Sequence, residues 1–143
     1  MVLAAILLLF QAAGHNPSPA SIAEFGRVSG YLQKWKVRLG LRDMPIALKL
    51  VTRQEMDLWM DDACGYSIYH DLGKPSVYGT ILVLRSDQYP QEGKPGVCGT
   101  SDIVLDQEHT VVHELLHYVV EVGTEEQKVD MLARNLVPVE EVK

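Results

Sequence analysis

The stretch HTVVHELLHYVVEVGTEEQKVD, residues 109–130, holds two histidines four positions apart, with a glutamate directly after the first. Residues at i and i+4 of a helix lie on one face, so His113 and His117 can present their imidazoles to a single cation. Glu114 lies one step round the helix, where it can hydrogen-bond a metal-bound water but is not the first choice as a ligand. The pattern predicts a zinc site on a helix.

The alternative is a surface helix that carries two solvated histidines. Val112, Leu115, Leu116 and Val119 make this helix apolar around much of its circumference. Buried helices do not normally hold histidines and glutamates without partners. The composition of the stretch therefore favours a metal site.

A catalytic zinc needs three protein ligands and one open position. His109 and Glu121 continue the same i, i+4 series. Eight residues of helix rise about 12 Å, whereas ligand atoms lie roughly 2 Å from zinc. A residue one turn beyond either His113 or His117 is therefore badly placed, and we expect the third ligand to return from another part of the chain.

A turn at residues 123–124 supplies this return, because the next helix then folds back beside the first. Glu126 and Asp130 share a face of that second helix, and we predict Glu126 as the third ligand, with Glu125 and Glu121 as alternatives. Glu125 is better suited to stabilising the positive N-terminus of the helix. Asp130 is predicted to accept the remaining N–H of a ligand histidine and so fix its tautomer; otherwise it is an exposed helix aspartate.

The motif HELLH, followed by EQKVD at residues 126–130, resembles the HExxH…ExxxD signature of gluzincin-type zinc metallopeptidases. The longer tail EQKVDMLARNLVP is similar to a pattern found in small members, the minigluzincins and the ImmA/IrrE-like peptidases. The similarity covers about residues 102–138. It implies a zincin-like fold, in which the third zinc ligand is a glutamate on a following helix and the strand region before the histidine helix forms the substrate-binding edge.

The remaining sequence predicts an α+β fold with a small, mixed or mainly antiparallel sheet. Apolar residues recur at steps of three and four from Ser21 to Gly40, which is typical of an amphipathic helix with Ser21 as N-cap and Gly40 as its end. Residues 52–63 fit either a helical turn or a strand, and residues 88–101 predict a loop. Strands are predicted at residues 46–51, 65–70, 77–84 and 103–105.

Two helices are predicted in the C-terminal third of the chain. The histidine helix is expected at about residues 107–122, with Asp106 as its cap and Gly123 as its end. The glutamate helix is expected at about residues 124–137, opened by a capping box at Thr124–Gln127 and stopped by Pro138.

An apolar run at residues 2–10 precedes a polar, proline-bearing stretch. It is shorter than the roughly 20 residues of a membrane-spanning helix and fits the apolar core of a secretory signal. We therefore predict a leader at residues 1–20 and a single domain at residues 21–143, secreted or periplasmic, with membrane contact only through the leader. If the run instead packs on the domain, the protein is cytoplasmic.

Cys64 and Cys98 are the only cysteines. In an exported protein they are expected to form a disulfide, whereas in a cytosolic protein they are better interpreted as two buried thiols. The formal net charge of −6 argues against nucleic acid as a partner, because nucleic-acid binding needs a basic face.

The leading hypothesis is a zinc-dependent peptidase that acts on a peptide or protein substrate, with Glu114 as the general base. The substrate would pair with a sheet edge formed by residues 65–70 or 77–84. Donors to the oxyanion are chemically available but carry no spacing argument: His70, His109, Tyr69 and Tyr118.

Two other hypotheses use the same residues. In the first, the domain is a catalytically silent or self-inhibited zincin that acts as a binding or regulatory module. In the second, its metal is structural. A structural zinc requires a fourth protein ligand, for which His109 and Asp106 are the nearest candidates.

Overall fold

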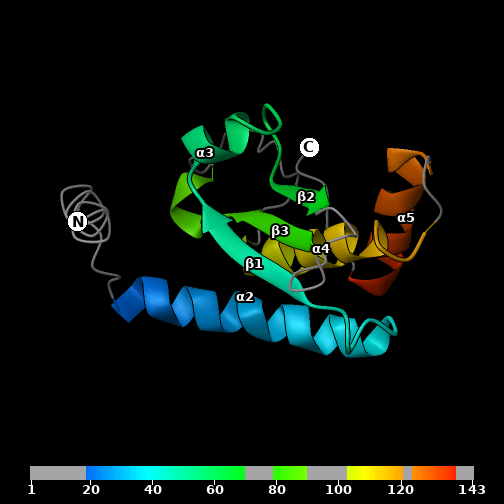
Figure 1. The fold of residues 1–143 in the computed structure, drawn as a ribbon. Helices are drawn as coiled ribbons and strands as arrows, with labels where there is room; N and C mark the ends of the chain where they lie inside the picture. Colours follow the sequence, from blue (N-terminus) through cyan, green and yellow to red (C-terminus); the bar gives the residue numbers. More distant parts are fainter. Residues whose placement is uncertain (1–18, 70–78, 90–102, 121–123, 138–143) are drawn as a thin grey trace, which may run out of the picture.

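The computed structural model describes residues 19–69, 79–89, 103–120 and 124–137. These ranges form a mixed α+β fold with four α-helices and one three-stranded mixed sheet. As Figure 1 shows, the long helix α2 runs along one side of the sheet, α4 lies behind the strands, and α5 stands beyond the end of α4. The predicted fold class is confirmed at this level.

Helix α2 covers Pro19–Arg38 and begins before the predicted N-cap, so Ser21 lies inside the helix. Proline is favoured at the first helical position, because it has no N–H group to leave unbonded there. The predicted end at Gly40 is confirmed: Gly40 has φ +75°, and the N–H of Leu41 donates to the carbonyl of Lys36 at 2.7 Å. This arrangement is a Schellman motif, which satisfies the last helical carbonyls.

The sheet contains β1 (Ile46–Val51), β2 (Gly65–Tyr69) and β3 (Gly79–Leu84), in the spatial order β1-β3-β2. Strand β3 is parallel to β1 and antiparallel to β2. The central position of β3 excludes it as a substrate-binding edge, which leaves the strand at residues 65–69 of the two predicted candidates.

Residues 52–63, predicted as either a helical turn or a strand, contain a short helix. Helix α3 covers Arg53–Asp57, and Thr52 and Glu55 form a reciprocal capping box at its start. Met56 is fully buried beneath it, with Val51 and Leu84.

Helix α4 covers Ile103–Leu116, so the predicted strand at residues 103–105 is wrong and Asp106 lies inside the helix instead of capping it. A short apolar run such as Ile-Val-Leu is equally compatible with a strand and with a buried helical turn, and sequence periodicity cannot separate the two. The helix also ends earlier than predicted, and residues 117–119 form a turn. Glu121 and Gly123 lie outside the described residues.

Helix α5 covers Glu126–Leu136, and its N-cap is Glu125, which makes no side-chain capping bond. The N-cap is therefore one residue later than the predicted Thr124, and the predicted capping box does not open the helix. Helix ends are the least certain part of a sequence-based assignment, because several nearby polar residues can cap equally well.

The main core lies between α2, the sheet, α4 and α5. It contains Val28, Leu32 and Trp35 of α2, Ile81 and Val83 of β3, Val111, Val112, Leu115 and Leu116 of α4, and Val129 and Ala133 of α5. Because the apolar side chains of α4 are buried in this core, its polar side chains hold a fixed orientation relative to β2 and α5.

Several predictions fall outside the described residues, namely those for residues 1–18 of the leader predicted at residues 1–20, His70, Cys98 and most of the loop at residues 88–101. Cys64 is disulfide-bonded, and Cys98 is the only other cysteine of the sequence. None of the helices in the described ranges is long and apolar enough to cross a membrane.

Candidate metal centre

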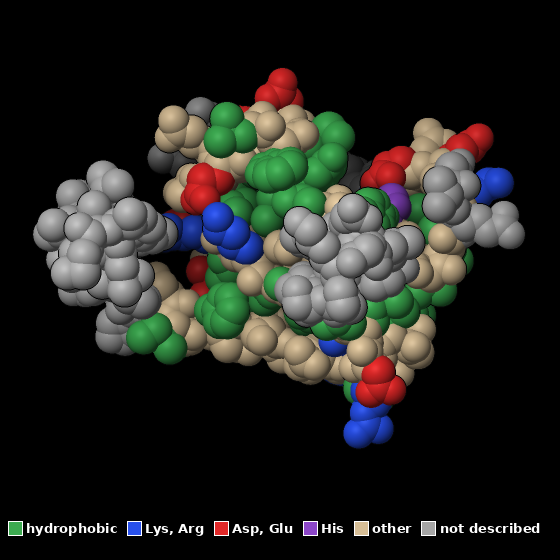
Figure 2. Space-filling model, viewed as in Figure 1, with side chains coloured by type: hydrophobic (Ala, Val, Ile, Leu, Met, Phe, Trp, Pro, Cys, Tyr) green, Lys and Arg blue, Asp and Glu red, His purple; other side chains and the backbone are tan. Residues whose placement is uncertain are grey.

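The end of α4 and the start of α5 bring His113, His117 and Glu126 together. The Nε2 atom of His113 lies 2.5 Å from Oε1 of Glu126, and Nε2 of His117 lies 3.3 Å from Oε2 of the same carboxylate. One donor atom of each residue lies within 4.8 Å of the others, a grouping that could hold a metal ion. Figure 2 shows histidine and acidic side chains at the surface beside α5.

The two imidazoles also determine the charge of Glu126. Burial alone would raise the pKa of this carboxyl group, but the hydrogen bond with His113 and the nearby His113 and His117 rings outweigh burial and lower the pKa. Glu126 is therefore held as a carboxylate, the form that binds cations.

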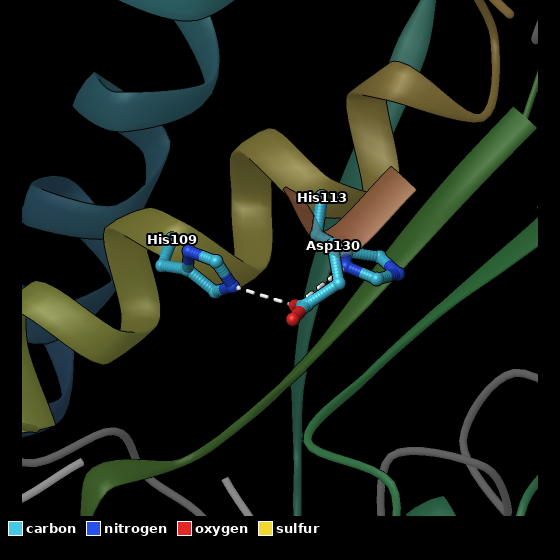
Figure 3. A group of neighbouring side chains, drawn as sticks. All are labelled: His109, His113 and Asp130. Atoms are coloured by element: carbon cyan, nitrogen blue, oxygen red, sulfur yellow. Dashed lines mark hydrogen bonds and ion pairs between the residues drawn. The ribbon is translucent and has the colours of Figure 1, made fainter. Parts of the chain in front are cut away.

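Asp130, one turn further along α5, faces the other nitrogen of His113 (Figure 3). Its Oδ1 atom lies 3.5 Å from Nδ1 of His113 and 3.1 Å from Nε2 of His109, and its Oδ2 accepts a 2.8 Å hydrogen bond from Nε of Arg134. A carboxylate at Nδ1 favours the tautomer in which Nε2 of His113 is unprotonated and available to a metal.

His109, one turn before His113 in α4, contacts the same carboxylate. Its side chain is buried, and besides its contact with Asp130 its Nδ1 lies 3.3 Å from the carbonyl of Val137. His109, His113 and Asp130 form a second grouping that could hold a metal ion. The two groupings share His113, which offers Nε2 to one and Nδ1 to the other.

Glu114 is buried between α4 and the edge strand β2. Its Oε2 accepts a 2.7 Å hydrogen bond from Oγ of Ser67. Burial raises the pKa of Glu114, against the opposing effects of His113, Ser67 and His117. Ser67 is not predictable as a site residue from sequence spacing; its one signal is a small polar side chain between the aromatics Tyr66 and Tyr69.

Close approach of β2 to α4 depends on Gly65. A Cβ atom at this position would lie 2.3 Å from Cγ2 of Thr110 and 3.1 Å from Cγ of Glu114. Strand side chains alternate between faces, so Gly65 and Ser67 lie on the same face of β2 and together seat it against the Glu114 side of α4.

Tyr69 and Tyr118, two of the four side chains chemically able to donate to the oxyanion, have hydrogen-bond partners in the structure. The hydroxyl of Tyr69 donates to the carbonyl of His117 at 3.3 Å, and that of Tyr118 donates to the carbonyl of Ile68 at 3.2 Å. Asp106 accepts a 2.8 Å bond from the Tyr89 hydroxyl. Within the described ranges, neither His109 nor Asp106 joins His113, His117 and Glu126 as a fourth member of their grouping.

Two pockets open on this centre. The smaller pocket has a volume of about 240 Å³ and includes His109, Thr110 and His113 in its lining. The larger pocket, about 460 Å³, includes Tyr66 and His117. Both pockets reach Glu114 and Glu126, so these carboxylates lie where the two pockets meet.

Comparisons with known proteins give no assignment: the chain matches no family model, no curated protein and no solved structure.

Proposed function

We propose that this chain is a small zinc-dependent peptidase of the gluzincin type, with His113, His117 and Glu126 as its zinc ligands. The main support for this proposal is that one ligand atom of each residue lies within 4.8 Å of the other two, beside the buried carboxylate of Glu114. Two imidazoles and one glutamate form the ligand set of one class of catalytic zinc site, in which the fourth position stays open. The absence of a fourth member among the described residues favours this class over a structural zinc.

When bound in such a site, zinc polarises a carbonyl oxygen and lowers the pKa of water. Glu114 would take a proton from the attacking water and pass it to the leaving amine. The Ser67 hydroxyl holds one oxygen of Glu114 in place. Asp130 would orient the ring of His113 through Nδ1.

The substrate would bind as an extended strand along β2. This strand pairs only with β3 within the described sheet, and a free edge can accept a peptide through main-chain hydrogen bonds. Both pockets lie along this edge, which supports a peptide or protein substrate.

Export also remains a proposal. A disulfide at Cys64 favours an oxidising compartment such as the periplasm or the extracellular space. This agrees with the secretory leader predicted from the apolar run at residues 2–10.

The test is a comparison of Glu114→Gln with His113→Ala in the full chain. Glu114→Gln should bind one zinc per chain and lose about 10²-fold to 10⁴-fold in turnover, whereas His113→Ala should lose both zinc and turnover. Metal content and hydrolysis of a peptide mixture are the two readouts. Unaltered hydrolysis in Glu114→Gln would refute the assignment, and a zinc-loaded wild type that cleaves nothing would favour a silent or self-inhibited binding module.

A further inference from the structure

The larger pocket has an apolar wall directly beside the candidate metal centre. Met60, Tyr66 and Tyr69 line it, together with His117 and Glu126 of the centre. Met60 lies in the turn between α3 and β2, and the two tyrosines belong to β2. Large apolar side chains that line a pocket reaching a reactive centre are typical of a ligand subsite.

Two side chains of this wall are exposed, and both of its tyrosine rings pack against another aromatic ring. Met60 is 49% exposed and Tyr69 is 56% exposed. The Tyr69 ring packs on Tyr118 with centroids 5.0 Å apart, and the Tyr66 ring lies 6.2 Å from that of Trp59. In Figure 2 hydrophobic side chains gather over α3 and the neighbouring β2. Exposed apolar groups that cluster in this way, instead of occurring singly, indicate a binding surface.

The smaller pocket differs in chemistry. Its lining includes Asp62, His109, Thr110 and Asp130 and no large apolar side chain. The two pockets, which share Glu114, therefore present one subsite with apolar side chains and one with polar side chains.

The direction of the bound peptide follows from β2. Antiparallel pairing is the more stable arrangement per residue, so a peptide added to this edge would run opposite to β2. The apolar wall includes the C-terminal residue of the strand, Tyr69. Tyr69 lies two residues past Ser67, which contacts Glu114, so Tyr69 would face the residues that precede the scissile bond.

We propose that the pocket lined by the side chains of Met60 and Tyr69 binds a large apolar or aromatic side chain on the N-terminal side of the scissile bond. This selectivity rests on the proposed peptidase function and adds the class of its substrate.

The experiment uses the full zinc-loaded chain and two internally quenched peptides that differ only in the residue before the cleaved bond, Phe in one and Glu in the other. Mass spectrometry of the products fixes the cleaved bond. The wild type should prefer the Phe peptide by at least about tenfold in kcat/KM, the discrimination expected of an apolar pocket. Met60→Lys should reduce or reverse this ratio.

Leu58→Lys is the matched control, because Leu58 is 82% exposed in the same turn but does not line the pocket. It should keep the wild-type ratio. If the wild type cleaves the Phe and Glu peptides equally well, or if both variants change the ratio of kcat/KM equally, the subsite is refuted. The peptidase function would remain intact. Failure of the zinc-loaded chain to cleave any peptide would overturn both.

Discussion

Ser67 connects β2, the proposed substrate-binding strand, to the candidate general base. Its side chain is buried, and its hydroxyl lies 2.7 Å from Oε2 of Glu114 and 3.1 Å from the backbone carbonyl of the same residue. Two residues from different elements are thereby fixed relative to each other. Sequence spacing cannot reveal such a pair, because 47 positions separate the partners.

Ser67→Ala should lower kcat by about tenfold, consistent with the loss of a hydrogen bond to a charged group, and should leave KM nearly unchanged. Ser67→Thr keeps the hydroxyl and suits a strand, so it should retain most of the activity. Steady-state kinetics at matched zinc content check this result. A Ser67→Ala enzyme with wild-type kcat would show that Glu114 needs no support from β2.

At the scale of the elements, the contact between β2 and α4 determines the shape of the site. Gly65 permits this contact, since the nearest atom to an added Cβ belongs to Thr110, on a helix whose other side is buried in the core. Neither the strand nor the helix can retreat without disturbing its other neighbours.

Gly65→Ala should lower the free energy of unfolding by about 1–3 kcal/mol, the usual cost of overpacking. Thr110→Ser removes the clashing methyl group, so the same alanine should cost clearly less in that background. Gly26→Ala is the control, because nothing lies within 4 Å of an added Cβ on that exposed helical position. Urea unfolding of the oxidised proteins measures the free energy of unfolding of each variant. If Gly65→Ala lowers this free energy equally in the wild-type and Thr110→Ser backgrounds, the proposed clash is contradicted.

The elements also show what could be predicted from sequence. The helix end at Gly40 and the strand at residues 46–51 follow from local turn chemistry and apolar pattern, and both are confirmed. The strand predicted at residues 103–105 is wrong, because three apolar residues contain no full period of either structure. The edge position of β2 depends on pairing between distant segments, which the sequence left as two alternatives.

The residues of the centre also divide into those that sequence can predict and those that it cannot. His113 and His117 are predictable from helical spacing alone. The prediction of Glu126 and Asp130 depended on the assumption that α5 returns beside α4. The structure places both carboxylates next to the histidines. The contributions of Ser67 and Gly65 arise only from tertiary packing.

At the scale of the whole molecule, Glu24 joins three separate parts of the chain. From α2 it accepts hydrogen bonds from the N–H of Ser86 at 2.7 Å and from the Gln107 side chain of α4 at 2.8 Å. Burial by itself would raise the pKa of Glu24, but these bonds and the nearby Arg27 outweigh it and lower the pKa below the ordinary value of 4.5.

A lowered pKa in the folded state means that the unfolded chain binds the proton first as the pH falls. The stabilising effect of Glu24 is therefore complete above pH 4.5 and is lost as the pH falls through the folded-state pKa. Glu24→Gln should flatten the decrease in unfolding free energy across this acidic window, measured in metal-free buffer. Asp43→Asn, at an exposed turn position, should keep the wild-type profile; an equal flattening there would contradict the role of Glu24.

The most direct test of the proposed centre is X-ray absorption at the zinc edge of the purified full chain. We predict two imidazole nitrogens, one carboxylate oxygen and one exchangeable oxygen at roughly 2.0–2.2 Å, without sulfur. Glu126→Gln should change this shell, and Glu125→Gln, which alters the adjacent acid at the α5 N-cap, should not. A shell of four protein ligands, or one that survives Glu126→Gln unchanged, would contradict a catalytic site built from His113, His117 and Glu126.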